Sequence, residues 1–342
     1  MGSLRLAPEW ARQDAVILVW PHAYSDWHSQ LEAIEKTYIE LSRYISRQQK
    51  LIMVAYNPAH QLYIRKTLSN HDIKQENVIF IDIATNDTWV RDYGPITVES
   101  DIGLTILDFK FNAWGNKYTH DDDDAFNKQF KQNINNKLPI KDIDFALEAG
   151  NLEINDLGIL LCSSSCFTHK SHEQEISLCS LEHDFENWFG CSRVLWIDDV
   201  ILNGDDTDGH IDTLARYCAD DIVVYTAVGN SSDPNNEALN VLSTQLKKIQ
   251  QNESTIFELV PLPSPKPIFN DANQLPATYA NFSICNDFIF VPVFNDQQDN
   301  YALKTIDELF PGHEIIDIEC NTLIQQYGGI HCSTMQIPEG FL

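Results

Sequence analysis

A unit of short apolar strands and one amphipathic helix recurs along this 342-residue chain, and it restricts the folds that the chain can adopt. Apolar residues at helical spacing predict helices at 28–49, 123–134, 173–188, 235–251 and 300–309. Between them, apolar stretches around a tight polar turn predict strand pairs, as in LEINDLGILLC, LARYCADDIVVYT and FSICNDFIFVPVF. The alternation of helices and strands is typical of an α/β fold.

The number of units predicts how they are arranged. ITVESDIGLTILDF, near residue 96, has the form of a further strand pair, and CSTMQI has the form of a truncated last copy. Five copies of one strand, loop, hairpin and helix unit favour an arrangement around an axis over one doubly wound sheet. No linker rich in proline, glycine and serine interrupts them, so residues 1–342 are predicted to form a single domain.

If the units surround an axis, their loops converge, and these loops carry an unusual set of side chains. Asp92 lies in NDTWVRDYGP, Glu148 in LEAGN, His210 and Asp212 in GDDTDGHID, and Cys332 in GGIHC. Three carboxylates, an imidazole and a thiol thus occupy equivalent places in four units. We expect these five side chains to lie together.

Cys332 is the member of this set whose interpretation matters most. It follows a glycine-rich loop and precedes a predicted strand, which is a common place for a reactive side chain. The alternative is a small buried hydrophobe, since free cysteines most often lie in a core. His210 and Asp212 have their own alternative, a structural hydrogen-bonded pair, but on a strand both would point to one face and could meet one substrate.

The charge balance limits the binding partners. Fifty acidic and 23 basic residues give a formal charge of −27, which repels nucleic acid and anionic lipid and suits a small cationic substrate. The alternative is that an acidic surface only favours solubility. No stretch approaches the apolar length of a membrane span and the first residues lack a signal-peptide core, so we expect a cytoplasmic protein; homo-oligomer formation stays open.

The eight cysteines are expected to be reduced thiols, because a chain of this length needs no disulfides to stabilise its core. Cys162, Cys166, His169 and His172 raise the question of a zinc site, but their spacing is more compressed than that of the usual separated ligand pairs. We predict no metal and no organic cofactor. The sequence also lacks a phosphate-binding glycine loop, a Gly-x-Ser-x-Gly elbow and a His-Glu-x-x-His motif.

Seven blocks of sequence resemble a known family. They are PEWARQDAVILVWPH, NDTWVRDYGP, FNAWGNK, LEAGN, GDDTDGHIDTLARY, LPATYANF and GGIHCSTMQIP. Their order is that of agmatine deiminases, within the guanidine-modifying superfamily that also holds arginine deiminases and bacterial peptidylarginine deiminases. The resemblance spans nearly the whole chain and implies a five-bladed pseudosymmetric α/β propeller, or pentein, which agrees with the five repeats.

The resemblance also implies roles for individual residues. Cys332 corresponds to the nucleophile, His210 to the acid/base, Asp92 and Asp212 to the carboxylates that bind guanidinium, Glu148 to a partner of His210 or of the guanidinium, and Asp206 to an aspartate that holds substrate. A planar, delocalised cation does need carboxylates on more than one edge. A thiolate can attack its carbon and form a covalent alkylthiouronium, which water then hydrolyses.

Two aromatic residues and two departures from the family pattern bear on substrate choice. Trp89 is predicted to bind substrate by covering the methylene chain or stacking on the cation, although a tryptophan at a strand end is more often core. Trp114 has the same ambiguity and is not included in the predicted site. Ala149 replaces the first glycine of Glu-Gly-Gly, and Asn86 replaces a frequent aspartate. Both departures concern substrate choice more than chemistry.

The activity that the resemblance implies is hydrolysis of agmatine to N-carbamoylputrescine and ammonia, in putrescine biosynthesis. Three alternatives stay open. The substrate could be arginine or peptidyl-arginine, the chain could bind a cationic ligand without turnover, or an amidinotransferase could pass the same thiouronium to an amine.

Overall fold

The computed structural model describes residues 4–134, 137–168, 177–229, 232–252 and 257–342. Their strands form five mixed sheets of three or four strands and one two-stranded hairpin. The sheets are β19-β2-β3-β4, β1-β5-β6-β7, β8-β9-β10, β11-β12-β13 and β16-β17-β18, and the hairpin is β14-β15. The chain is thus the α/β protein that the sequence predicts.

Each sheet is built on the same plan. The strands are β1 (Arg5–Leu6), β2 (Gln13–Val19), β3 (Lys50–Ala55), β4 (Val78–Asp82), β5 (Ile96–Ser100), β6 (Gly103–Lys110), β7 (Ile140–Ala146), β8 (Glu153–Ile154), β9 (Ile159–Ser163), β10 (Arg193–Ile197), β11 (Ala215–Ala219), β12 (Ile222–Ala227), β13 (Glu258–Pro263), β14 (Phe269–Asn270), β15 (Asn273–Gln274), β16 (Ser283–Cys285), β17 (Phe288–Val293), β18 (Glu314–Glu319) and β19 (Thr334–Pro338). Four hairpins, β5-β6, β8-β9, β11-β12 and β16-β17, are each followed by a parallel third strand.

The fifth sheet joins the two ends of the chain. β19 pairs antiparallel with β2, which in turn pairs parallel with β3. The segment predicted to be a truncated last copy therefore obtains its second and third strands from the N-terminal region. This pairing explains why the last unit carries only one strand of its own.

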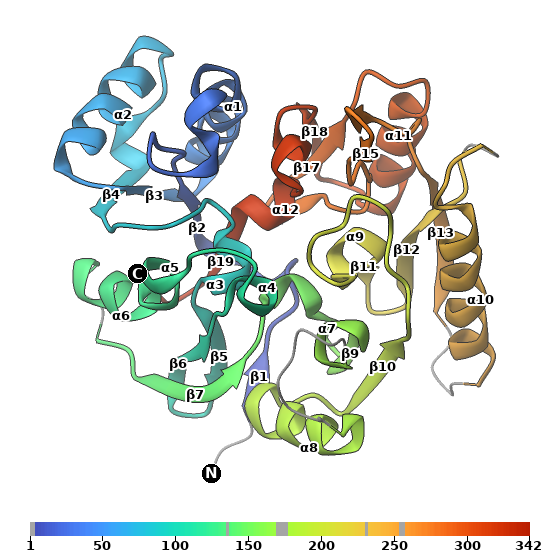
Figure 1. Ribbon diagram of the computed structural model, residues 1–342. Coiled ribbons are helices and arrows are strands. Elements are labelled where there is room, and N and C mark those ends of the chain that lie inside the picture. The colour runs from blue at the N-terminus through green and yellow to red at the C-terminus, as the bar shows by residue number, and fades with distance from the viewer. Residues whose placement is uncertain (1–3, 135–136, 169–176, 230–231, 253–256) are drawn as a thin grey trace.

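A helix connects the second and third strands of each unit, as a parallel connection requires. These helices are α1 (Leu31–Gln48), α6 (Phe126–Asn133), α8 (Leu178–Phe189), α10 (Asn236–Asn252) and α11 (Asp299–Leu309). They lie within or near the five predicted ranges, although residues 173–176 of one range lie outside the described residues. In Figure 1 they surround several very short helices near the middle of the view.

Apart from one further long helix, the remaining helical elements that the structure describes are very short. They are α3 (Val90–Tyr93), α4 (Ala113–Asn116), α5 (Asp121–Asp124), α7 (Ser165–Thr168), α9 (Ile211–Leu214) and α12 (Ile330–Ser333), with 3-10 turns η1 (Asp26–Ser29), η2 (Gln75–Asn77), η3 (Ala149–Asn151) and η4 (Leu323–Gln326). Of these, α3, η3 and α9 lie just before the first strand of a hairpin, and α12 lies just before β19. The four contact one another in the pairs α3–α12, α3–η3 and α9–η3.

One long helix, α2 (Pro58–Asn70), was not predicted. Only Ile64 and Leu68 are buried in it, so its sequence lacks a strong apolar stripe. Its start does have a recognisable signal, because Asn57 caps the helix by accepting a hydrogen bond from the His60 amide and Pro58 occupies the first turn.

The core is divided between the two faces of β2 and β3. Val16, Leu18 and Met53 belong to one buried cluster, which includes side chains of α1 and β17, whereas Ile17 and Ile52 belong to another, which includes side chains of β5 and β6. Successive residues of a strand point to opposite faces, so each face of this sheet packs against a different neighbour. Within the described residues, no helix combines the length and the apolar character that crossing a membrane would require.

Candidate active site

The five predicted site residues lie on or next to the short elements α3, η3, α9 and α12. Asp92 is in α3, Asp212 in α9 and Cys332 in α12, while Glu148 and His210 directly precede η3 and α9. The expectation that His210 and Asp212 share one face of a strand is wrong, because His210 is the N-cap of a single helical turn. Contacts among these turns nevertheless bring the five side chains together, and all five are buried.

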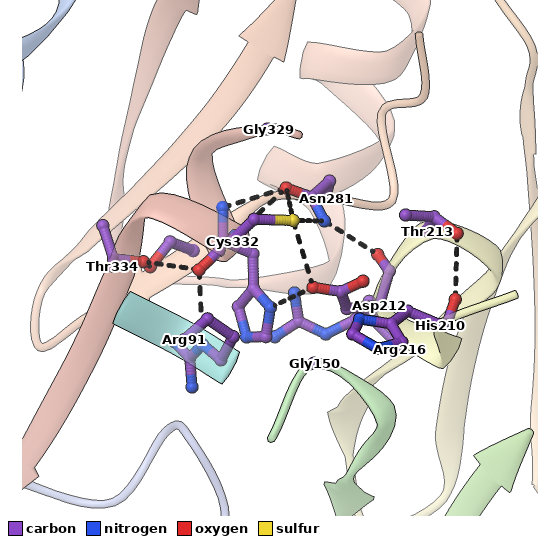
Figure 2. Close-up of polar contacts among 12 residues, drawn as sticks. Arg91, Gly150, His210, Asp212, Thr213, Arg216, Asn281, Gly329, Cys332 and Thr334 are labelled. Carbon is purple, nitrogen blue, oxygen red and sulfur yellow. Dashed lines mark hydrogen bonds and ion pairs between the residues drawn. The ribbon is translucent and has the colours of Figure 1, made fainter. Parts of the chain in front are cut away.

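The thiol of Cys332 lies between an amide and a carboxylate (Figure 2). Its Sγ is 3.3 Å from Asn281 Nδ2, 3.5 Å from Asn281 Oδ1 and 3.6 Å from Asp212 Oδ2. Burial, together with the negative charges of Asp212 and Asp92, raises the pKa of Cys332 well above its ordinary value. The resting side chain is therefore a neutral thiol, and a bound cation would favour its ionisation.

His210 is completely buried between two carboxylates. Its Nδ1 is 3.7 Å from Asp92 Oδ1 and its Nε2 is 3.8 Å from Glu148 Oε2. Burial alone would lower the pKa of His210, but the charges of Asp92, Asp212 and Glu148 raise it to about 10. The imidazole is therefore protonated at neutral pH, and it can donate a proton.

Asp92 is held by two hydrogen bonds. Its Oδ1 accepts from the Gly150 amide and its Oδ2 accepts from Trp114 Nε1, each at 3.0 Å. Burial and the charges of Asp212 and Glu148 raise the pKa of Asp92 to about 6, although His210 opposes this shift. Trp114, which was left out of the predicted site, thus belongs to it.

The glycine that this site requires is Gly150. A Cβ at that position would lie 2.6 Å from His210 Nδ1 and 2.7 Å from Asp92 Oδ1, closer than side chains tolerate. Ala149, the departure from the family pattern, is buried beside it and has no positive φ. The substitution at 149 therefore leaves the close contact at 150 intact.

Several polar atoms of the site have no hydrogen-bond partner among the residues that the structure describes. They are both ring nitrogens of His210, Glu148 Oε1 and Asp212 Oδ1, and all are buried. Leaving such atoms unpaired in a folded protein is costly, so native structures rarely do it without reason. A planar ligand with several N–H donors would satisfy the two carboxylate oxygens.

A pocket of about 420 Å³ opens onto Cys332. It is lined by Asp26, Asp87, Trp89, Asp92, Trp114, Tyr118, Asp206, Thr207, Gln326, Tyr327, Gly328 and Cys332. Burial, and less strongly the charge of Asp26, raises the pKa of Asp87 to about 7. The pocket is thus acidic beyond the thiol, and it has aromatic walls.

Trp89 is both a core residue and part of this wall. It is almost fully buried, and its ring lies 5.9 Å from the ring of Trp27, measured between centroids. A Cβ at Gly328 would collide with the Trp89 ring, so the glycine allows the loop before Cys332 to approach it. Both interpretations of Trp89 are therefore compatible with its position.

Asp206 lines the pocket but is not alone there. Its Oδ2 accepts a 2.7 Å hydrogen bond from the Tyr118 hydroxyl, and its Oδ1 lies 3.3 Å from Lys117 Nζ. The segment around Asp206 contains no lysine or arginine, but the fold brings Lys117 to it from another unit. Sequence reasoning missed this cation because it is distant in the chain.

Asn86, the second departure from the family pattern, is used in the local structure. Its Oδ1 accepts hydrogen bonds from the amides of Asp122 and Asp123, at 2.9 and 3.3 Å. Its own amide donates to Asp123 Oδ1 at 2.8 Å. Asn86 therefore fixes the start of α5 and is not among the residues that line the pocket.

The compressed cysteine and histidine cluster is only partly described. Cys162 Sγ donates to the Asn151 carbonyl at 2.8 Å, and Cys166 Sγ lies 3.7 Å from the carbonyls of Thr207 and Asp208. His169 and His172 lie outside the described residues. The prediction that this segment holds no metal stays a prediction.

Comparison with known proteins identifies the family of this chain. Residues 5–338 match the Porphyromonas-type peptidyl-arginine deiminase family. The chain belongs to this family. An agmatine deiminase of Pseudomonas putida is 27% identical over 96% of this chain and 94% of that one. The structure of a cysteine-to-serine variant of the C. jejuni agmatine deiminase with substrate bound is 33% identical, with a TM-score of 0.91, and the match covers 99% of this chain and 97% of that one. The C. jejuni agmatine deiminase itself is 33% identical, with a TM-score of 0.88, and the match covers 99% and 98% of the two chains.

Within this deiminase family, the predicted resemblance is confirmed at the level of the fold and of the relatives. The family-like blocks LPATYANF and GGIHCSTMQIP contain two residues that sequence reasoning did not assign, Asn281 and His331. Both contact the site, Asn281 through the Cys332 thiol and His331 through Asp212. Their position inside these blocks was the one signal that could have identified them.

Proposed function

We propose that this chain hydrolyses agmatine to N-carbamoylputrescine and ammonia, as a step in putrescine biosynthesis. The observation that carries the proposal is the surrounding of Cys332: a thiol, a protonated imidazole and unpaired carboxylate oxygens meet at the end of an acidic pocket. The names of the relatives support agmatine as the substrate.

We assign guanidinium binding to Asp92 and Asp212. Asp212 presents an unpaired Oδ1, and Asp92 keeps capacity on oxygens that accept only one hydrogen bond each. Carboxylates on two edges of a planar cation fix it in one orientation, so its carbon faces the thiol. Arrival of the positive charge also offsets the acidic environment that keeps Cys332 protonated.

The first chemical step forms a bond between Cys332 Sγ and the guanidinium carbon. The C–N bond to one terminal nitrogen breaks as His210 donates a proton to it, and ammonia leaves. In sum, the thiol, the guanidinium and the His210 imidazolium give an alkylthiouronium, ammonium and a neutral imidazole, so the departing nitrogen takes one proton from His210 and one from the thiol. Glu148, 3.8 Å from His210 Nε2, keeps the imidazole charged before this transfer.

The second step consumes water. His210, now neutral, accepts a proton from water as its oxygen adds to the thiouronium carbon, and the C–S bond then breaks. The products are the ureido compound, the Cys332 thiol and the His210 imidazolium, so both side chains return to their starting protonation states. We propose no metal or organic cofactor for either step, because side chains of the site supply each proton transfer and the nucleophile.

Asp206, together with Asp26 and Asp87, is assigned to the amine end of agmatine. These carboxylates lie along the pocket beyond Cys332, and an ammonium favours them. Trp89 is assigned to the methylene chain. Lys117 is the observation that favours the alternative, since it could pair with the carboxylate of arginine or of an arginyl peptide.

For the architecture, we propose that the five sheets are the blades of a five-bladed pseudosymmetric α/β propeller formed by one domain, residues 1–342. The common plan of the sheets and the completion of the fifth by both chain ends support it. A cytoplasmic location, the absence of nucleic acid partners and the oligomeric state stay predictions.

Ammonia release from agmatine, free arginine and an arginyl peptide tests the substrate. We expect agmatine to give the highest kcat/KM, with no acceptor amine added and with chelator present. Equal or greater activity on arginine or on the peptide would refute the agmatine assignment. Turnover that requires an added amine would instead show an amidinotransferase.

A further inference from the structure

His331, which directly precedes Cys332, connects the active site to a second buried carboxylate. Its Nδ1 lies 2.8 Å from Asp212 Oδ2, and its Nε2 lies 2.8 Å from Glu9 Oε2. The side chain is 2% exposed, so water cannot take the place of either contact. The proposed mechanism assigns no role to this imidazole.

Both contacts are hydrogen bonds only if His331 carries a proton on each ring nitrogen. An ionised carboxylate accepts hydrogen bonds but cannot donate, and a neutral imidazole has one N–H. Burial would raise the pKa of Asp212, but the hydrogen bond and charge of His331 lower it below its ordinary value. Burial is likewise outweighed at Glu9, where Arg216 and His331 hold the pKa well below the usual range. Both carboxylates are therefore ionised, and each can accept a hydrogen bond from one ring nitrogen of His331.

The far end of this chain of contacts is fixed. Glu9 forms an ion pair with Arg216, and its Oε1 accepts a 2.8 Å hydrogen bond from the Ile284 amide. Arg91 Nη2 is 4.0 Å from the same oxygen, and Arg91 Nε donates to the His331 carbonyl at 3.2 Å. His331 is thus held through both its ring and its backbone.

At the Asp212 end of this chain of contacts, His331 determines which oxygen of Asp212 is available. Oδ2 is occupied by His331 and approached by the Cys332 thiol, whereas Oδ1 is buried with no hydrogen-bond partner among the described residues. A carboxylate held by one oxygen presents the other in a single orientation. Figure 2 shows Asp212 in this place, below Cys332 and beside Asn281.

We propose that His331 is a positioning residue, a buried imidazolium held by Glu9 that keeps Asp212 ionised and leaves its Oδ1 for the guanidinium. The inference rests on the proposed function in so far as it takes a guanidinium as the ligand of Asp212. The charged groups around His331 are Asp212 from α9, Glu9 from the segment after β1, Arg91 from α3, Arg216 from β11 and Glu153 from β8.

The charge of His331 can be observed directly in the unaltered protein. Neutron diffraction from crystals exchanged into heavy water at neutral pH should show deuterium on both Nδ1 and Nε2 of His331. Deuterium on one nitrogen alone would overturn the proposal. This measurement needs neither a variant nor turnover, so it stands even if agmatine is not the substrate.

A double-mutant cycle tests whether His331 acts through Asp212. His331→Asn should lower kcat/KM for agmatine by about 30-fold or more, because it removes one partner of a buried charge pair. In an Asp212→Asn background the same change should cost less than about threefold, since the carboxylate that it positions is gone. Equal losses in both backgrounds, or no loss in the native background, would show that His331 has only a structural role or none.

Failure of the His331 proposal and failure of the proposed agmatine hydrolysis give different results. If the native protein releases no ammonia from agmatine, the proposed function is wrong while the neutron result still decides the charge of His331. If His331→Asn does not fold, as thermal unfolding would reveal, His331→Gln enters the same cycle and the same two outcomes apply.

Discussion

Two buried clusters of acids and cations lie on either side of Asp212, and they differ in how completely they are paired. In the network behind it, Arg216 forms ion pairs with both Glu9 and Glu153. In the active-site cluster, His210 and Glu148 are close but too far apart to form a hydrogen bond, and each has unpaired buried atoms. The same residue types thus support the fold where their partners are complete and remain available for a ligand where they are not.

The largest effect is expected at the thiol. Cys332→Ala removes the only thiol that the pocket lining contains, so kcat should fall by at least about 10⁴-fold, as losses of catalytic nucleophiles do. Cys320→Ala is the matched control, because that buried thiol donates to the Ile318 carbonyl at 3.2 Å and does not line the pocket. Ammonia release should be near native in the control. A loss in Cys332→Ala that is much smaller than about 10⁴-fold would mean that another group is the nucleophile.

The next effect is expected in the paired network and concerns stability. Arg216→Met leaves Glu9 and Glu153 buried without their cation, which should lower the free energy of unfolding by about 4 kcal/mol. Arg12→Met is the control, since the Arg12 pair with Asp287 is exposed and worth less than about 1 kcal/mol. Urea unfolding measures both. Similar losses in the two variants would remove the distinction between the clusters.

In the active-site cluster, neutralising a charge should leave stability intact and lower activity. Glu148→Gln keeps the shape of a side chain whose Oε1 has no hydrogen-bond partner among the described residues, so unfolding free energy should be unchanged or higher. We expect kcat/KM to fall about 100-fold, because a buried charge beside His210 is lost. Urea unfolding and steady-state kinetics check the two halves. A large loss of stability would place Glu148 with the structural network.

A smaller effect is expected on the pH dependence of kcat/KM, which reports the charges of the active-site cluster. Guanidinium binding needs ionised Asp92, with a pKa of about 6, and ammonia departure needs protonated His210, with a pKa of about 10. In the free enzyme kcat/KM should therefore rise with pH through about 6 and fall through about 10. Glu148→Gln should move the upper limb to lower pH, since it removes one charge that raises the His210 pKa. An unmoved limb would exclude His210 as its source.

The sequence predicted much of the fold because its signals were local. The helices at 235–251 and 300–309 correspond to α10 and α11, and four polar turns do close antiparallel hairpins. The one-turn helices that carry Asp92, Asp212 and Cys332 are too short to show a helical period, so they were interpreted as loops or strands. The role of β2 in completing the last unit depends on pairing between the chain ends, which no local pattern contains.

The active site likewise contains residues that local sequence predicts and residues that it does not. The residues near the thiol were predictable from motifs, but their partners were not. Lys117 and Asn281 reach Asp206 and Cys332 from other units, and Trp114 reaches Asp92 from 22 residues further along the chain. Glu9 and Cys332 likewise approach the same carboxylate network from opposite ends of the sequence. Such contacts follow from the arrangement of the sheets and not from the chemistry of any one segment.

Mass spectrometry of the covalent intermediate tests the central claim most directly. The protein is mixed with agmatine, quenched in acid and digested, with His210→Ala included because it lacks the group proposed to activate water. We predict an amidino adduct that keeps the agmatine alkyl chain on the peptide that contains Cys332, and on no other of the eight cysteines. An adduct on a different cysteine, or ammonia release at the native rate from a protein whose Cys332 never carries one, would contradict the account.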